Sequence, residues 1–339
     1  MNKLLLLINF KLKTMKKLFL ILISISIGFY ACKKNDDGPI IYAPYITNVT
    51  LDFFKDNLND GKQITAVDIS SEAWILGNKG TQIYIYPCSF LDADGNTVTG
   101  IIDFELIEAQ TNLDMLKINR PTFTKDGQLL VSGGIVYVNA TQNGNPLQIN
   151  PNCGLQASIP EVIGSNLQMQ YFRGSEDENN VFSWEESAED TVTTNIVWDS
   201  TGGQGQQWTT YGFSMDSIGW INCDYFYNTQ SELTGVQIEL SNGYNGSNSQ
   251  SFIYYSSINS LAGLNDNDQD GVFDLGGGYE TPIGMNVKFV VLSEDSNGDY
   301  YYHITSNTTI TMNHYEIIPN MIGPISHSDL EVILNNNLP

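Results

Sequence analysis

Short runs of apolar, β-branched and aromatic residues, separated by Asx-Gly pairs, most constrain what this chain can fold into. Residues 236–240 alternate, with Val236, Ile238 and Leu240 on one face, as in a half-buried strand. Other runs of strand length cover residues 82–86, 101–107, 134–140 and 287–292. The pairs between such runs are Asp94-Gly95, Asp126-Gly127, Asn143-Gly144, Asn242-Gly243 and Asn297-Gly298. Because these residues tolerate the positive φ that tight hairpins need, they predict antiparallel pairing.

One helix is expected, at the C-terminal end. Ser326 and Asp329 have the spacing of a weak capping box, and Leu330, Ile333 and Leu334 follow it. No period of 20–50 residues indicates a solenoid. We therefore predict an all-β protein with two antiparallel β-sandwich-like domains and a short C-terminal helix.

Charge divides the chain and excludes one class of function. The 339 residues include 38 acidic and 15 basic ones, a net charge of −23, and after residue 173 the only basic residue is Lys288. This asymmetry predicts an N-terminal β-sandwich domain over residues 42–162 and an acidic β-rich domain over residues 163–339. Without a basic stripe to replace phosphate counterions, nucleic acid is not an expected partner. A hydrophobic share of 41% argues against wholesale disorder.

The N-terminal segment has the parts of a secretory signal. Met15, the expected true start, precedes Lys16 and Lys17, and an apolar stretch of 14 residues runs from Leu18 to Ala31. That stretch is too short to span a bilayer as a helix. Residues 1–31 are thus a predicted signal peptide, although a short anchor is an alternative.

Cys32 gives this segment a sharper interpretation. Ala31-Cys32 resembles the end of a lipobox, where the Cys thiol receives a lipid. The following Lys-Lys-Asn-Asp-Asp resembles the tag that sends Bacteroidota lipoproteins to the cell surface. The resemblance implies a lipidated acidic tether over residues 32–41, palmitate at Cys32, and an outer-membrane location facing outward.

Three cysteines then remain in an oxidising envelope: Cys88, Cys153 and Cys223. They allow at most one internal disulfide, and the sequence leaves open which two would form it.

Two segments of the body resemble known bacterial proteins. Residues 80–100 and 104–108, Arg120-Pro-Thr122 and residues 129–134 are similar to a recurrent module of Bacteroidota lipoproteins. More distantly, this module resembles the β-sandwich domain shared by zonula-occludens proteins, netrin receptors and ankyrins, which is a structural and interaction module. Residues 169–174 and 218–224 are similar to uncharacterised proteins of the same bacterial group. There an Arg often follows the Asp, whereas Tyr225 stands here. The likeness implies an architecture and a habitat, and it carries over no catalytic residue.

One loop has the residues of a calcium site. Asp266, Asp268 and Asp270 occupy positions 1, 3 and 5 of a pattern that matches the front of an EF-hand loop, with Gly271 at position 6. The remaining expected ligands are the position 7 backbone carbonyl and a carboxylate at position 9, which are Val272 and Asp274. Position 12 is Gly277 in place of Glu, and Glu280 could substitute for it. We predict structural calcium here. The alternative is a solvated acidic turn between strands. For the shorter Asp92–Asn96 segment we favour a hairpin turn over a calcium site.

Catalytic patterns are missing from the sequence. His303, His314 and His327 form no metal-like pair, and Gly212-Phe-Ser214-Met-Asp216 lacks the closing Gly of a nucleophile elbow. Paired carboxylates could serve a glycosidase, but spacing selects no pair among 38 acids.

We therefore expect a non-enzymatic binding, adhesion or complex-subunit role, with a possible protein partner in an outer-membrane complex. Two alternatives stay open. Glycan binding for nutrient capture requires solvent-exposed aromatics in the second segment, whose tryptophans are Trp184, Trp198, Trp208 and Trp220. A carbohydrate-active hydrolase requires a cleft with two convergent carboxylates.

Overall fold

The computed structural model describes residues 51–162, 164, 168–176, 182–198, 207–241 and 243–338. All of them belong to one compact unit that runs from Tyr42 to Pro339. The signal peptide, the lipidation site at Cys32 and the tether over residues 32–41 lie outside the described residues. No described helix is both long and apolar enough to cross a membrane.

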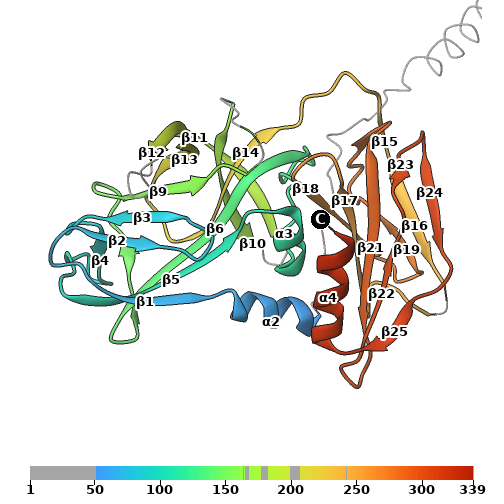
Figure 1. Ribbon diagram of the computed structural model, residues 1–339, viewed down its shortest axis with the longest axis horizontal. Helices are drawn as coiled ribbons and strands as arrows, with labels where there is room; N and C mark the ends of the chain where they lie inside the picture. The colour runs from blue at the N-terminus through green and yellow to red at the C-terminus, as the bar shows by residue number, and fades with distance from the viewer. Residues whose placement is uncertain are drawn as a thin grey trace, which may run out of the picture. The chain divides into compact units, whose positions relative to one another are not determined.

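Two antiparallel sheets form the first sheet pair (Figure 1). The seven-stranded sheet has the order β1 (Gln63–Asp68), β5 (Ile101–Ala109), β6 (Leu130–Gln142), β14 (Gly219–Phe226), β10 (Gln170–Glu176) and β11 (Phe182–Thr191), and β7 (Asn145–Pro146) pairs with β6. The five-stranded sheet has the order β12 (Thr193–Trp198), β13 (Gln207–Met215), β9 (Leu155–Pro160), β3 (Gln82–Ile85) and β2 (Ala73–Leu76). β4 (Phe90–Leu91) and β8 (Gln148–Ile149) form a separate short antiparallel pair.

Alternation explains why these two sheets pack face to face. In β3, Ile83 and Ile85 are buried while Gln82 and Tyr84 are half-buried. The buried side chains of both sheets meet in one hydrophobic cluster, to which the seven-stranded sheet contributes Phe104 among others. Two faces that each present apolar residues at every second position gain stability by covering one another.

Two further sheets form the second sheet pair. The six-stranded sheet has the order β18 (Ser260–Leu264), β17 (Ser249–Tyr255), β21 (Asn286–Glu294), β22 (Tyr300–Ile304) and β25 (Ile322–Ile325), and β23 (Thr308–Thr309) pairs with β21. The three-stranded sheet has the order β19 (Val272–Asp274), β16 (Val236–Leu240) and β24 (His314–Ile318). β15 (Leu233–Thr234) pairs with β20 (Thr281–Pro282). Ile238, Phe273 and Phe289 belong to the hydrophobic cluster of these strands.

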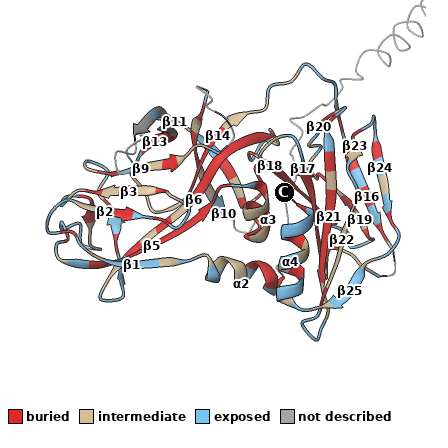
Figure 2. Ribbon diagram, viewed as in Figure 1, coloured by how far each residue is buried: buried red, intermediate tan, exposed pale blue. Residues whose placement is uncertain are grey.

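Among the described residues, three helices accompany the strands: α2 (Asp52–Asp60), α3 (Asn112–Lys117) and α4 (His327–Asn337). Each supplies apolar residues, such as Phe53, Met115 and Leu330, to a third cluster. That cluster also contains Phe252 of β17 and Trp184 of β11. β17 and β21 are buried along nearly their whole length (Figure 2) because their two faces contribute to different clusters.

The all-β prediction is confirmed, with antiparallel pairing almost throughout. β16 and β24 are the exception, since they pair in parallel. The C-terminal helix is also confirmed: the Ser326 side chain accepts a hydrogen bond from the Asp329 N–H at its N-terminus. The helices α2 and α3 were not predicted. α3 does carry a local signal, because Thr111 and Asp114 form a capping box.

The sheets do not divide at residue 162, where the sequence analysis placed a domain boundary. β9 ends at Pro160 and pairs with β13, while β6 pairs with β14, so strands from both sides of residue 162 share both sheets of the first pair. After Phe226, which ends β14, the chain contributes no further strand to the first sheet pair. The number of basic residues drops near residue 174, but the strand pairing does not change there.

The three cysteines are also placed. Cys88 and Cys153 form a disulfide across a sequence separation of 65 residues, and Cys223 is a buried free thiol in β14. Desolvation raises the pKa of the Cys223 thiol, which keeps it protonated and unreactive.

Candidate functional site

Three of the predicted calcium ligands lie in a loop, hereafter the acidic loop (residues 266–271), between β18 and β19, and the other two, Val272 and Asp274, lie in β19. The ends of the loop are joined by two backbone hydrogen bonds, from the Asn265 N–H to the Asp274 oxygen at 2.7 Å and from the Asp274 N–H to the Asn265 oxygen at 2.8 Å. Gly271 has a φ of +90°, and a side chain there would approach the carbonyl oxygens of Leu240 and Tyr244. The glycine expected from the motif is therefore required by both the sharp turn and the close backbone approach.

Asp266 organises the acidic loop from within. Its side chain is only 1% exposed. Oδ1 accepts a hydrogen bond from the Asp270 N–H at 3.1 Å, and Oδ2 accepts from the Gly271 and Gly246 N–H groups, both at 2.9 Å. These bonds fix the carboxylate against its own loop and against the neighbouring residue 246.

Three of the five predicted ligands come together. The carboxylates of Asp266, Asp268 and Asp270 each have an oxygen within 4.8 Å of the others, and the last two are exposed. Asp274 is not part of this cluster, because its Oδ1 accepts a hydrogen bond from the Gly276 N–H at 2.7 Å. Val272 lies in β19, opposite Glu239 of β16.

The chemistry of this cluster suits a hard cation. Like charges held this close repel one another unless a cation or several N–H groups compensate them. Calcium takes six to eight oxygens at flexible geometry. Three carboxylates supply part of such a set, and backbone carbonyls and water would have to supply the rest.

The Asp92–Asn96 segment shows the contrasting case. Asp92 Oδ1 accepts hydrogen bonds from the Asp94 and Asn96 N–H groups, at 3.0 and 2.8 Å, which lower the pKa of Asp92. Asp94 points to solvent, and no cluster of three metal-binding side chains occurs here among the described residues. This segment is a hairpin turn.

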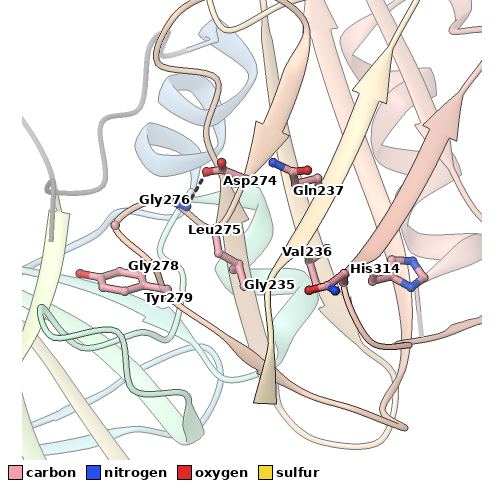
Figure 3. Close-up of a pocket in the computed structure, with 11 residues that line it drawn as sticks. Gly235, Val236, Gln237, Asp274, Leu275, Gly276, Gly278, Tyr279 and His314 are labelled. Carbon is pink, nitrogen blue, oxygen red and sulfur yellow. Dashed lines mark hydrogen bonds between the residues drawn. The ribbon is translucent and has the colours of Figure 1, made fainter. Parts of the chain in front are cut away.

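A pocket of about 250 Å³ lies where β16 begins and β19 ends (Figure 3). Gln237 and Asp274 lie side by side at one end of it, and Tyr279 lies on the other side. The His314 ring is directed away from them and stacks on Phe289 at 5.4 Å between centroids. Burial lowers the pKa of His314. Asp274 is the one carboxylate among the described residues that line this pocket, so it holds no pair for glycoside hydrolysis.

A second depression, of about 540 Å³, does contain several carboxylates: Asp126, Glu185 and Glu186. Asp126 is engaged within its own turn, since it accepts hydrogen bonds from Thr124 Oγ1 and Gln128 Nε2. Glu185 and Glu186 are consecutive on β11 and therefore point to opposite faces of the strand. At most one of them converges with Asp126.

The second-segment aromatics are mostly interior. Trp184 and Tyr171 are fully buried, and Trp220 is half-buried beside Arg120. The side chains of Trp198 and Trp208 lie outside the described residues. None of the described tryptophans of this segment therefore offers an open face to solvent.

Asp224 is a buried acid that sequence reasoning did not single out. It is fully buried in β14, and desolvation raises its pKa to about 8. A hydrogen bond from Asn222 Nδ2 to Asp224 Oδ2 opposes this shift without cancelling it. The carboxyl group is thus largely protonated at neutral pH, inside the protein and away from the pockets described above.

Sequence reasoning also missed an exposed tryptophan. Trp74 of β2 points outward from the five-stranded sheet and is 66% exposed. Ala73, Trp74, Ile75 and Leu76 are all apolar, so alternation carries no signal about which of them faces solvent.

Comparison with known proteins identifies no family. No family model matches the chain, and no curated protein matches it. Among solved structures, the chain is similar to a gamma-CGTase from Alkalophilic bacillus clarkii, with 9% sequence identity and a TM-score of 0.18. The match covers 74% of this chain and 40% of that enzyme's chain, so this chain spans less than half of that protein. A likeness this slight carries no argument about function.

Proposed function

We propose that the chain is a lipid-anchored protein of the outer membrane, facing outward, with a non-enzymatic binding, adhesion or complex-subunit role. A structural calcium ion in the acidic loop stabilises its second sheet pair. The observation that carries the calcium part of the proposal is the clustering of Asp266, Asp268 and Asp270 in a loop whose ends are joined by backbone hydrogen bonds.

Two features support an exported location. The N-terminal segment has the parts of a lipoprotein signal that ends at Cys32. The Cys88–Cys153 disulfide suits an oxidising compartment, because cytosolic thiols are kept reduced. The resemblance of most of residues 75–325 to Bacteroidota lipoproteins and to uncharacterised proteins of the same group supports the same location.

The calcium role has a direct test in thermal unfolding. A ligand that binds only the folded state at 100 times its Kd stabilises it by about 2.7 kcal/mol, which raises Tm by roughly 5 °C in a chain of this size. We expect that rise on adding calcium to chelator-treated protein. The double variant Asp268→Ala plus Asp270→Ala should abolish it, since two of the three clustered carboxylates are lost.

Asp94→Ala is the matched control, because Asp94 lies in an acidic turn without a carboxylate cluster and should keep the full rise. Equal Tm values in calcium and in chelator would leave the acidic loop as a turn only.

The anchor is tested separately. Cys32→Ala should abolish labelling by a radioactive fatty acid and release the protein from the membrane fraction. Protease added to intact cells should degrade the wild-type protein if it faces outward. Labelling that persists in Cys32→Ala would refute lipidation at this residue.

The proposal of a complex-subunit role predicts a stoichiometric partner. Affinity purification from native outer membrane in mild detergent should recover that partner. A protein purified alone would favour independent binding or adhesion.

A further inference from the structure

The outward face of the five-stranded sheet, hereafter the uncharged face, has a regular order. Register places Trp74, Tyr84, Gln156 and Ser214 in one row across β2, β3, β9 and β13. A second row follows with the residues two positions along: Leu76, Gln82, Ser158, Gly212 and Thr193. The intervening residues, such as Ile83 and Phe213, point inward to the core. Four steps between neighbouring strands make the face roughly 19 Å wide.

The uncharged face is hollowed into a depression of about 370 Å³. No Asp, Glu, Lys or Arg occurs among the described residues that line it, although the chain carries a net charge of −23. The lining consists largely of hydroxyl and amide side chains, with aromatic rings at one side. The described lining residues therefore offer a ligand no charged group.

Aromatic rings mark the edge of the face at β2 and β3. The Trp74 ring lies 4.7 Å from that of Tyr84, and the Tyr84 ring lies 4.6 Å from that of Tyr86, both edge to face. A hydrogen bond to Glu72 raises the pKa of Tyr84 to about 12. Trp74 is therefore supported from one side and keeps the rest of its ring open to solvent.

The floor of the depression offers hydrogen-bonding groups. Gln156 Nε2 donates to Ser214 Oγ at 2.6 Å, and Asn195 Nδ2 donates to Thr193 Oγ1 at 3.3 Å. Both amides keep their carbonyl oxygens and second N–H for a ligand.

Gly212 opens the space between these pairs, because a Cβ there would lie 2.5 Å from Asn195 Nδ2. Two positions before Gly212 on the same strand, Thr210 is only 3% exposed, and its Oγ1 has no hydrogen-bond partner among the described residues. A buried hydroxyl without a partner is costly, and a ligand hydroxyl would supply the missing bond.

From these observations we infer that the uncharged face binds a neutral glycan. The ring of Trp74 stacks on the apolar face of a sugar, and the amides and hydroxyls along the row receive its hydroxyl groups. A protein partner would be expected to bury a central apolar or aromatic core. Here the aromatics lie at the edge and the centre is polar. The inference deepens the proposed binding role and rests on it.

Binding of the full-length protein in detergent to immobilised polysaccharides tests the inference. The probes are the neutral polymers α-glucan, β-glucan, xylan and mannan, with polygalacturonate and chondroitin sulfate as charged counterparts. We expect binding to at least one neutral polymer and no binding that depends on charge. Trp74→Ala should weaken the affinity about tenfold or more, and Gln156→Ala should weaken it less.

Ile64→Ala is the matched control, because Ile64 is as exposed as Trp74 but lies on β1 of the other sheet. It should bind as the wild type does. An unchanged Tm for each variant excludes misfolding as the cause of any loss. The inference is overturned if no neutral polymer binds, or if Trp74→Ala binds as tightly as wild type.

The tests of glycan binding and of calcium binding can fail independently. Asp268→Ala plus Asp270→Ala, measured below its own Tm, should keep glycan binding, because the acidic loop and the uncharged face belong to different sheet pairs. Glycan binding without a calcium-dependent Tm would refute the calcium role and keep this inference. A calcium-dependent Tm with no glycan binding would refute this inference and keep the calcium role.

Discussion

In the first sheet pair a covalent bond joins distant parts of the chain, since Cys88 lies just after β3 and Cys153 just before β9. The second sheet pair contains no cysteine, and its strands β18 and β19 are connected through the acidic loop. The stability of the two sheet pairs should therefore depend on different solution conditions. The first pair should respond to reductant, and the second should respond to calcium.

Removing the disulfide has the largest expected effect. Replacing Cys88 and Cys153 by Ser should lower the free energy of unfolding by about 4 kcal/mol, because the crosslink closes a long loop and restricts the unfolded chain. Urea unfolding measures the loss. Reductant should destabilise the wild type by a similar amount and leave the double variant unchanged. A variant that reductant still weakens would show that the disulfide is not the reductant-sensitive element.

Asp224 should make the first sheet pair sensitive to pH. Its folded pKa of about 8 lies above its ordinary value of 3.8, so the folded state binds the proton more tightly. The stability this group contributes is therefore fully present below pH 4 and is lost as the pH rises through 8. The slope approaches about 1.4 kcal/mol per pH unit within that window.

Asp224→Asn should remove this slope, as measured by urea unfolding at several pH values between 4 and 8. Asp103→Asn is a suitable control, because Asp103 is an exposed residue of β5 in the same sheet. Parallel curves for wild type and Asp224→Asn would refute the assignment.

The smallest expected change in stability comes from substituting Thr122, which contacts β18 of the second sheet pair. Thr122 Oγ1 lies 2.9 Å from Ser260 Oγ and accepts a hydrogen bond from the Leu261 N–H at 3.0 Å. Thr122→Val should cost about 1 kcal/mol, and Thr122→Ser should restore most of it. Because this contact joins both pairs, hydrogen exchange should quicken in both. Faster exchange in one pair alone would show that the two are not coupled here.

Local patterns predicted much of the secondary structure. The strand at 236–240 matches β16 in full, and the Asx-Gly pair at Asn143-Gly144 has positive φ at both residues, as a tight hairpin requires. These features depend on neighbouring residues only. The parallel pairing of β16 with β24, the choice of disulfide partners and the return of β14 to β6 join distant residues, so no local pattern contains them.

The same distinction between local and distant residues applies to the two candidate sites. The motif brought Asp266, Asp268 and Asp270 together because they lie within five residues of one another. Asp274 pairs with Gln237 of β16 and lines the neighbouring pocket, and its place among the calcium ligands stays a prediction. Trp74 and Gln156 are 82 positions apart, and only the register of β2, β3 and β9 places them in one row.

Amide hydrogen exchange in calcium and in chelator tests the difference between the two sheet pairs most directly. We expect calcium to slow exchange in peptides covering residues 236–240 and 260–274, and to leave residues 82–85 and 155–160 unchanged. Identical exchange in both conditions, or slowing spread equally over both sheet pairs, would contradict a calcium ion that stabilises the second pair.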